Sequence, residues 1–413
     1  MLKVNPFAAL RPQPSLAAQL ASVPYDVVNT EEARALAAGN ALSFLHVVRS
    51  EIDLPADTNP YADIVYETAA KNFQKLQAEG VMIREQKPLI YLYRQEKELL
   101  GKLRSQLGVM ACCHVDDYNN GIIKKHEKTR KDKEDDRTRH VLSINANAGP
   151  VFLLYKDQSN ITEMMNKDAS QPPLYDFTAV DGVRHTVWQV SDPAAYVAAF
   201  GKIPTAYIAD GHHRSASAAR AGMERRAKNP NHAGNEEYNW FLSVLFPASH
   251  LTILPYHRVI KDLNGLTPEG LLEKVRAVAT VKETTNPEPP STLSFGMYVA
   301  GKWYMVSLDP KTVDLSDAVG SLDYVLLSER ILHPILGIGD IRTDKRIDFV
   351  GGIRGTSELE KRVNSGDCAV AFAMHATTIE QLIKVADAGQ IMPPKSTWFE
   401  PKLRSGLLVH TLD

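Results

Sequence analysis

The sequence predicts an α+β protein with mixed sheets. Apolar segments of strand length alternate irregularly with helical segments along the chain, which is not the regular alternation of a parallel α/β fold. Two strand-like segments, residues 177–180 and 183–190, flank Asp181-Gly182, which is a strong signal for an antiparallel hairpin. Residues 205–221, by contrast, have the pattern of a strand, a tight turn and a helix. Hairpins together with a strand–turn–helix unit favour mixed sheets.

Composition places the chain among globular proteins. Of its 413 residues, 44% are hydrophobic and 23% charged. The net charge of -2 gives no bulk basic field, so nucleic-acid binding is disfavoured. Cys112, Cys113 and Cys368 form neither a disulfide framework nor a zinc pattern. With no signal-peptide core and no membrane-spanning apolar run, we expect a cytoplasmic protein without a membrane partner. A homo-oligomer remains open.

The length predicts two or three domains. We place an N-terminal region at residues 1–115, a nucleotide-binding core at 116–262 and a C-terminal α+β domain at 263–413.

The N-terminal region begins with irregular, proline-punctuated chain. Asn29 and Glu32 have the spacing of a capping box, and Gly39 ends that short helix. Residues 43–48 are apolar and predict the next strand. A longer helix starts at Pro60 and ends at Gly80. One face of it carries Tyr61, Val65, Ala69, Phe73 and Leu76.

Further strands are predicted on both sides of the central unit. Residues 89–93 and 107–113 form a hairpin around Gly101, and residues 240–246 and 251–254 follow the central helix. Residues 286–291 are proline-rich and predict a linker or loop. Later elements are a hairpin at 295–299 and 303–306, a helix at 322–331 and a strand at 369–374. We interpret residues 392–399 as a structural tail, with contact to the functional site as the alternative.

The central stretch has the residues of an anion site. Asp210-Gly211 is turn chemistry, and the alanine-rich segment after it is a strong helix former. A helix start offers backbone N–H groups and partial positive charge. Gly211 permits close approach of a ligand, Arg214 can bind two phosphate oxygens, and His212 and His213 add donors. The stretch predicts phosphate binding. The alternative is an Asp-capped helix whose histidines bond local carbonyls.

A dense charged run, residues 124–137, supplies the second group of candidates. Glu127 follows His126 and lies beside Lys124 and Lys125, so its carboxylate could accept a hydroxyl proton near bound phosphate. The alternative is a solvated helix in which Glu127 pairs with Lys131.

No metal-ligand pattern is evident in the sequence. Adjacent His212 and His213 cannot readily chelate one ion, and no His-Glu-x-x-His motif is present. The metal ligands are therefore unknown, and Mg²⁺ held mainly by nucleotide phosphates remains compatible with the sequence. Residues 337–342 lack the third glycine of a dinucleotide fingerprint, and no Gly-x-Ser-x-Gly motif occurs. We interpret His185 as a structural residue.

Asp210-Gly211-His212-His213-Arg214 resembles the nucleotide-binding motif of free L-serine kinases in the ParB/sulfiredoxin superfamily. Over nearly its full length the chain also resembles a widespread bacterial family of long, uncharacterised proteins. That wider resemblance rests on the segments at residues 24–27, 44–47, 124–127, 210–214 and 392–399. It implies a ParB/sulfiredoxin-like nucleotide-binding core with additional N- and C-terminal segments. His212 stands where sulfiredoxin needs a cysteine, which argues against that redox reaction.

The resemblance implies a small-molecule kinase that transfers a phosphoryl group from ATP or ADP, with Mg²⁺, to free L-serine. The alternative is a ParB-like nucleotide-binding regulatory protein. On chemical grounds we assign the base to Glu127, with His126 beside it and Asp210 as its rival. The residues expected to bind the nucleotide are Asp210, Gly211, His212, His213, Arg214 and Lys125.

Overall fold

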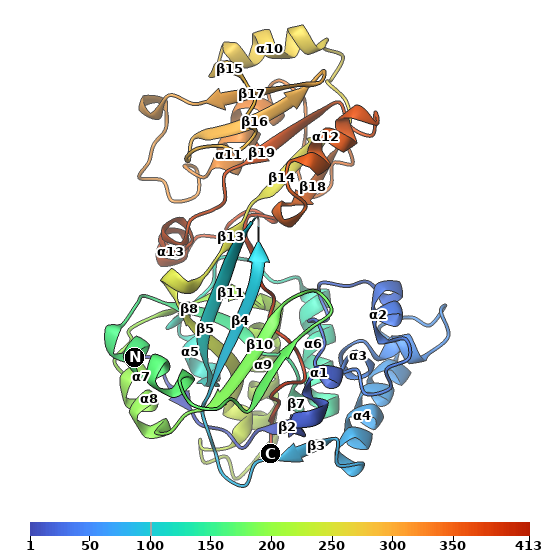
Figure 1. Cartoon of the computed structure of the whole chain (residues 1–413), viewed down its shortest axis with the longest axis vertical. Coiled ribbons are helices and arrows are strands. Elements are labelled where there is room, and N and C mark those ends of the chain that lie inside the picture. The colour runs from blue at the N-terminus through green and yellow to red at the C-terminus, as the bar shows by residue number, and fades with distance from the viewer. Residues whose placement is uncertain (100) are drawn as a thin grey trace. The chain divides into compact units, whose positions relative to one another are not determined.

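The computed structural model describes residues 1–99 and 101–413, which form two compact units (Figure 1). Unit 1 comprises residues 1–98, 102–251 and 401–413, and unit 2 comprises residues 99–101 and 252–400. The first two predicted regions share one sheet, so the boundary expected at residue 115 falls inside unit 1. The boundary expected at residue 262 falls inside unit 2. The α+β class with mixed sheets is confirmed.

Unit 1 is built on a nine-stranded sheet of mixed direction. The strand order is β6-β11-β8-β12-β5-β4-β10-β9, with β1 also pairing β5. β11 is parallel to β6 and antiparallel to β8, whereas β8 and β12 are parallel. The strands are β1 (Val4–Asn5), β4 (Tyr91–Leu99), β5 (Lys102–His114), β6 (Ile123–Lys124), β8 (Val151–Tyr155), β9 (Tyr175–Thr178), β10 (Arg184–Gln189), β11 (Ala206–Asp210) and β12 (Trp240–Pro247). The hairpins predicted around Gly101 and Asp181-Gly182 are confirmed as β4–β5 and β9–β10.

The helices of unit 1 contribute to its hydrophobic core. Apolar side chains of β5, β8, β11 and β12 pack with those of α7, α8 and α9. α6 and α5 lie against α9. The helices are α1 (Ala17–Leu20), α2 (Thr30–Ala37), α3 (Leu45–Val48), α4 (Asp63–Ala78), α5 (Val115–Asn119), α6 (Lys131–Ile144), α7 (Ser159–Ala169), α8 (Pro193–Phe200) and α9 (His212–Lys228). This core fixes β11 and α9, the elements that carry the central motif.

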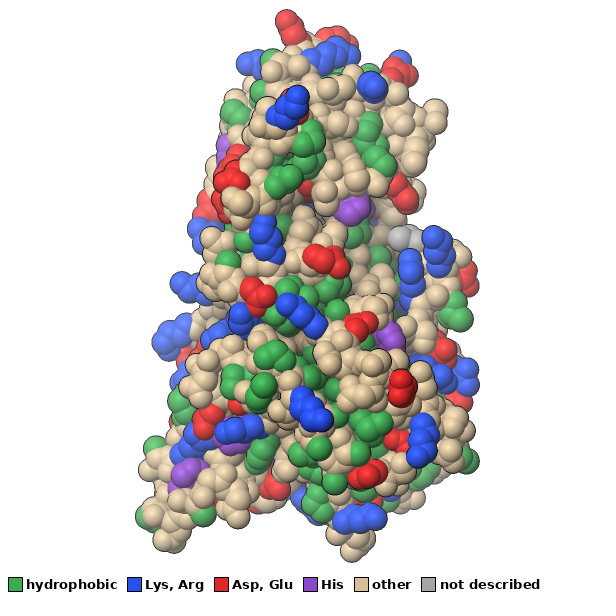
Figure 2. Space-filling model, turned by 90° about the vertical axis from the view of Figure 1, so that its left-hand side faces the viewer, with side chains coloured by type: hydrophobic (Ala, Val, Ile, Leu, Met, Phe, Trp, Pro, Cys, Tyr) green, Lys and Arg blue, Asp and Glu red, His purple; other side chains and the backbone are tan. Residues whose placement is uncertain are grey.

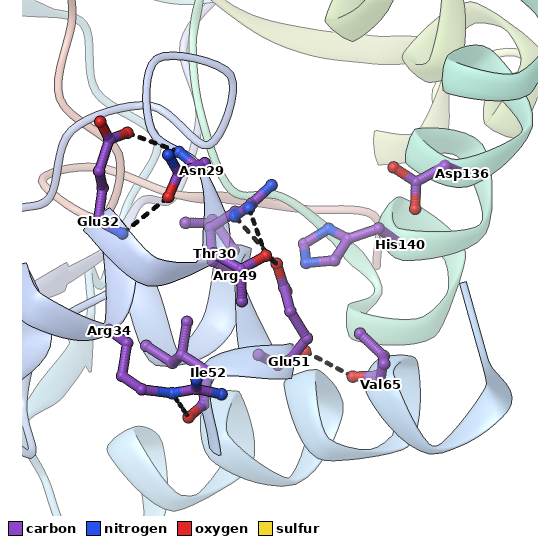
Figure 3. Close-up of polar contacts among 12 residues, drawn as sticks. Asn29, Thr30, Glu32, Arg34, Arg49, Glu51, Ile52, Val65, Asp136 and His140 are labelled. Atoms are coloured by element: carbon purple, nitrogen blue, oxygen red, sulfur yellow. Dashed lines mark hydrogen bonds and ion pairs between the residues drawn. The ribbon is translucent and has the colours of Figure 1, made fainter. Parts of the chain in front are cut away.

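Helices α1–α4 form a separate hydrophobic cluster at the N-terminal side of unit 1. The capping box of α2 is confirmed: Asn29 Oδ1 accepts the Glu32 N–H at 2.9 Å, and the Glu32 carboxylate accepts the Asn29 N–H at 2.8 Å (Figure 3). Arg34 donates to the Ile52 carbonyl at 3.1 Å. The strand predicted at residues 43–48 is wrong, because Leu45–Val48 is the short helix α3.

The error at α3 has a local cause. The Ser43 hydroxyl accepts the Leu45 N–H at 3.4 Å and so favours a helical turn. Phe44, Leu45, Val47 and Val48 are all buried, and His46 alone is partly exposed, so the run is too short to reveal a helical period.

The C-terminal tail, residues 401–413, returns to unit 1 after the whole of unit 2 in sequence. Ser405 bridges to Ser22, and Val409 bridges to Leu10. β21 (His410–Thr411) pairs antiparallel with β7 (Ala146–Asn147). The separate small pair β2 (Leu10–Pro12) and β3 (Met82–Arg84) lies in the N-terminal part. The tail is therefore an integral part of unit 1.

Unit 2 contains a six-stranded antiparallel sheet in the order β15-β17-β16-β19-β14-β18. The strands are β14 (Tyr256–Ile260), β15 (Thr280–Thr284), β16 (Ser294–Val299), β17 (Lys302–Ser307), β18 (Ile347–Gly351) and β19 (Val370–Met374), with β13 (Ile253–Leu254) pairing β20 (Trp398–Phe399). The helices are α10 (Pro268–Arg276), α11 (Asp323–Leu327), α12 (Ser357–Asn364) and α13 (Ile379–Asp387), and a π-helical turn, Ser328–Leu332, follows α11. The proline-rich residues 286–291 are a loop between β15 and β16.

The surface carries charges of both signs. On the face drawn in Figure 2, Lys and Arg side chains are interspersed with Asp and Glu side chains.

Within the described residues, no helix combines the length and the apolar character needed to cross a membrane.

Candidate functional site

The central motif folds as the sequence predicts. β11 ends at Asp210 and α9 begins at His212. Gly211 between them has φ 91° and ψ 34°, a left-handed conformation that side chains disfavour. A Cβ added at Gly211 would lie 3.2 Å from Arg214 Nε. The turn therefore requires glycine, and the first N–H groups of α9, which have no partners within the helix, face outward from its start.

Arg214 is bound to three partners within the protein. Its Nη1 donates to the Pro150 carbonyl at 2.6 Å, and its Nη2 lies 3.2 Å from Asp210 and 3.4 Å from Asp26. Its side chain is 10% exposed. Nε is buried without a hydrogen-bond partner. The guanidinium thus stabilises the turn and links Asp26 to it. Some of its N–H donors are therefore already used in bonds within the protein.

Asp210 lies between two cations. Its carboxylate is 3.2 Å from Arg214 Nη2 and 3.4 Å from Lys402 Nζ. Burial raises the pKa of Asp210, but Lys402, Arg214 and His212 outweigh burial and hold that pKa below its usual range. Asp210 is therefore an ionised anchor for cations and a poor acceptor for a proton.

Two buried imidazoles meet next to this turn. The rings of His126 and His212 are perpendicular, with centroids 4.5 Å apart. Burial lowers the pKa of His126 to about 4, and burial together with His126 lowers the pKa of His212 well below its ordinary value. Nε2 of His212 is buried without a hydrogen-bond partner, and the buried ring of His126 has the Ile208 carbonyl as a backbone neighbour. Two buried neutral rings, one with an unsatisfied nitrogen, form a place where a polar ligand group would be stabilised.

Glu127 lies at the edge of the same cluster. Its carboxylate is 3.7 Å from His212 Nδ1, and its side chain is 47% exposed. Helix α6 begins only at Lys131, whose ammonium bonds Asp135 at 2.7 Å. Glu127 therefore precedes the charged helix. A half-exposed carboxylate beside buried imidazoles can reach both solvent and the turn.

The other two predicted residues have different surroundings. Nζ of Lys125 lies over the Tyr118 ring, 4.2 Å from its centroid. His213 Nε2 accepts the Arg130 N–H at 3.1 Å, which ties α9 to the loop before α6. The fold thus brings Asp210, His212 and the 126–127 segment together, whereas Lys125 and His213 hold neighbouring parts of the loop.

Sequence reasoning missed several residues of this cluster. Asp26 and Lys402 make the ion pairs described above, and Arg137 stacks on Tyr25 with 4.3 Å between guanidinium carbon and ring centroid. Tyr25, Arg137, Arg214 and Ser405 line a small pocket of about 40 Å³, enough for a few water molecules. Residues 24–27 are one of the segments on which the resemblance to the long bacterial family rests. That resemblance was the only sequence feature that pointed to Tyr25 and Asp26.

The site suits a phosphate-bearing ligand. The left-handed glycine, the helix start and the unsatisfied nitrogen atoms of Arg214 and His212 are the features of an anion cradle. Among the described residues, no group of three or more His, Cys, Asp or Glu side chains is placed to hold a metal ion.

Sequence comparison places the chain in a family. Residues 4–325 match the family described as "Protein of unknown function (DUF1015)", and the chain belongs to that family. No curated protein matches the chain.

Several solved structures show a distant similarity of fold. A free serine kinase in complex with AMP is 13% identical, with a TM-score of 0.35 over 73% of this chain and 91% of that chain. A mutant free serine kinase in complex with ADP is 12% identical, with a TM-score of 0.36 over the same shares. SbnI with C-terminal truncation from Staphylococcus aureus is 11% identical, with a TM-score of 0.35 over 72% of this chain and 85% of that chain. Such values assign no role to individual residues.

Proposed function

We propose that the protein is a small-molecule kinase that transfers a phosphoryl group from ATP or ADP to the hydroxyl of free L-serine. The observation that carries the proposal is the junction of β11 and α9, where the left-handed Gly211 opens a helix start beside Asp210, His212 and Arg214. Serine as the acceptor follows from the resemblance of the Asp-Gly-His-His-Arg motif to free-serine kinases.

In the proposed complex the nucleotide phosphates lie at the start of α9. Backbone N–H groups of residues 211–213 and the positive end of the helix dipole attract the phosphate oxygens. Arg214 contributes positive charge beside the turn, and His212 supplies a further donor in the tautomer that carries its proton on Nε2. Mg²⁺ would be held mainly by the phosphates and would neutralise charge that develops on them.

Glu127 is the proposed general base. It takes the proton of the serine hydroxyl while that oxygen forms a bond to the terminal phosphorus. The bond between this phosphorus and the bridging oxygen breaks, and the electron pair leaves with ADP, or with AMP when ADP is the donor. The carboxylate lies 3.7 Å from His212 at the turn, within reach of a hydroxyl bound there. Asp26, 3.4 Å from Arg214, is the rival carboxylate.

An acceptor screen tests the proposed function. The purified protein, Mg²⁺ and either ATP or ADP are incubated with L-serine, D-serine, L-threonine or no acceptor, and nucleotide turnover is measured. Turnover that depends on L-serine supports the kinase. Tight nucleotide binding without acceptor-dependent turnover would instead support the ParB-like regulatory alternative.

A further inference from the structure

We propose that Lys402, supplied by the C-terminal tail, is a further nucleotide-binding residue that contacts the phosphate groups at the Gly211 turn. This inference rests on the nucleotide-binding part of the proposed function. Lys402 lies beyond residues 4–325, which match the family.

Lys402 places its ammonium beside Asp210, the residue that ends β11 at the turn. Its Nζ is 3.4 Å from Asp210 Oδ2, and its side chain is 20% exposed. An ammonium group has three donors, of which a single carboxylate oxygen engages one. The remaining donors can therefore bind phosphate oxygens. Asp210 also has Arg214 as a counter-ion at 3.2 Å, and Arg214 is shared with Asp26, so Lys402 adds a second cation at the Asp210 carboxylate.

The backbone at Lys402 is fixed by two buried glutamines. Gln95 Nε2 donates to the Lys402 carbonyl at 2.8 Å, and Gln106 Nε2 donates to the Pro401 carbonyl at 3.2 Å. The two glutamines are bonded to each other at 2.9 Å, and both are buried. Burying amides is unfavourable unless they are hydrogen-bonded, so this pair specifically recognises the tail at this point.

A second buried network fixes the tail two residues later. Arg404 Nε donates to His185 Nε2 at 3.1 Å, and its Nη2 bonds Asp181 at 2.5 Å. The other ring nitrogen of His185 lies 2.7 Å from the Tyr93 hydroxyl. Burial lowers the pKa of His185 to about 3, which keeps the ring neutral and able to accept from Arg404. The tail is thus attached at residues 401–402 and again at residue 404, which restricts where the Lys402 ammonium can lie.

Nucleotide-binding measurements on Lys402→Met test the inference. Lys167→Met is the control, because Lys167 is an exposed lysine on α7 in the same unit. Affinities for adenosine, AMP, ADP and ATP are measured by calorimetry. Lys402→Met should weaken ADP and ATP binding by about tenfold or more and leave adenosine binding unchanged. Lys402→Gln serves for the same comparison if the Met variant does not fold.

Each outcome decides the question. Unchanged ADP affinity in Lys402→Met, or an equal loss for adenosine and ADP, would overturn the role of Lys402 while leaving the proposed function intact. If the wild-type protein binds none of these ligands, the proposed function fails and the inference with it. In Lys402→Met with Asp210→Asn, restored ADP affinity would show that Lys402 only neutralises Asp210. The inference requires that affinity stays low.

Discussion

At the scale of single residues, the proposed chemistry depends on one carboxylate. Glu127→Gln keeps the shape of the side chain but removes the proton acceptor. Because a serine hydroxyl is a poor nucleophile until its proton can leave, turnover should fall about a hundredfold or more. Nucleotide affinity should change little, because glutamine keeps the size of the side chain beside His212 Nδ1 and the proposed phosphate contacts come from the α9 backbone, Arg214 and His212. Steady-state kinetics and calorimetry on one preparation measure both quantities.

The matched variant for this prediction is Asp26→Asn. Asp26 is also a carboxylate at the turn, but it is paired with Arg214. If Asp26→Asn abolishes turnover while Glu127→Gln remains active, the base is Asp26, and the assignment of Glu127 is wrong.

Arg214 is expected to act on both binding and stability. Arg214→Ala should weaken nucleotide binding by about 1.5–3 kcal/mol, the range for hydrogen bonds to charged groups. The substitution also removes the counter-ion that Asp26 and Asp210 share. The free energy of unfolding should therefore fall by about 3 kcal/mol. Arg184→Ala, which removes an exposed pair with Asp176, is the control. Unchanged nucleotide affinity in folded Arg214→Ala protein would contradict the phosphate site.

The sequence reveals the contiguous part of this cluster and, through its charged run, the 126–127 segment that the fold brings beside it. Residues 210–214 are neighbours in the chain, and their turn chemistry is local, so their arrangement was predictable. Asp26 and Lys402 reach the turn from the two ends of the chain. Their positions depend on contacts between segments far apart in the chain, which no local pattern encodes.

At the scale of the element, the β11–α9 turn depends on Gly211. Gly211→Ala should destabilise the protein by about 1 kcal/mol through its left-handed backbone. It should also weaken nucleotide binding, because the new Cβ would lie 3.2 Å from Arg214 Nε. Thermal unfolding and calorimetry measure the two effects.

Gly234→Ala is a matched control for the turn. Gly234 has φ 94°, nearly the same as Gly211, but an added Cβ there meets nothing within 4 Å. It should therefore share the backbone cost and keep nucleotide affinity. Equal nucleotide affinities in the two variants would argue against a role of this turn in binding.

Among the elements, those with a clear period or turn signal were predicted correctly. The amphipathic helix α4 and the β9–β10 hairpin are examples, since the first buries Val65 and Phe73 on one face and the second turns at Asp181-Gly182. The expectation that Tyr61 lies on that face is wrong, because Tyr61 precedes α4 and is 44% exposed. The strand predicted at residues 43–48 is wrong because the four buried apolar residues of this short run leave only His46 partly exposed, too little to show a helical period.

At the scale of the whole molecule, buried neutral histidines should make stability pH-dependent. Burial, followed by the charge of Arg137, lowers the pKa of His140 to about 4. The unfolded chain, with a pKa near 6.5, binds a proton at higher pH than the folded chain. Stability from this group is therefore complete above about pH 6.5 and is lost as the pH falls towards 4.

His140→Gln tests this dependence. His140 Nε2 lies 2.9 Å from the Val47 carbonyl, and a glutamine amide can also donate to a carbonyl. Between pH 7 and pH 5 the wild-type protein should lose about 2 kcal/mol of unfolding free energy more than the variant. Denaturant unfolding at the two pH values measures the difference. An identical loss in both proteins would show that His140 does not remain neutral in the folded state.

The central claim for the whole molecule is phosphoryl transfer to free L-serine. The most direct measurement is ³¹P NMR of the wild-type protein and Glu127→Gln incubated with L-serine, Mg²⁺ and ATP or ADP. The account predicts that an O-phospho-L-serine resonance grows with the wild-type protein and is about a hundredfold slower with the variant. Absence of that resonance with both nucleotides, in protein that binds them, would contradict the account.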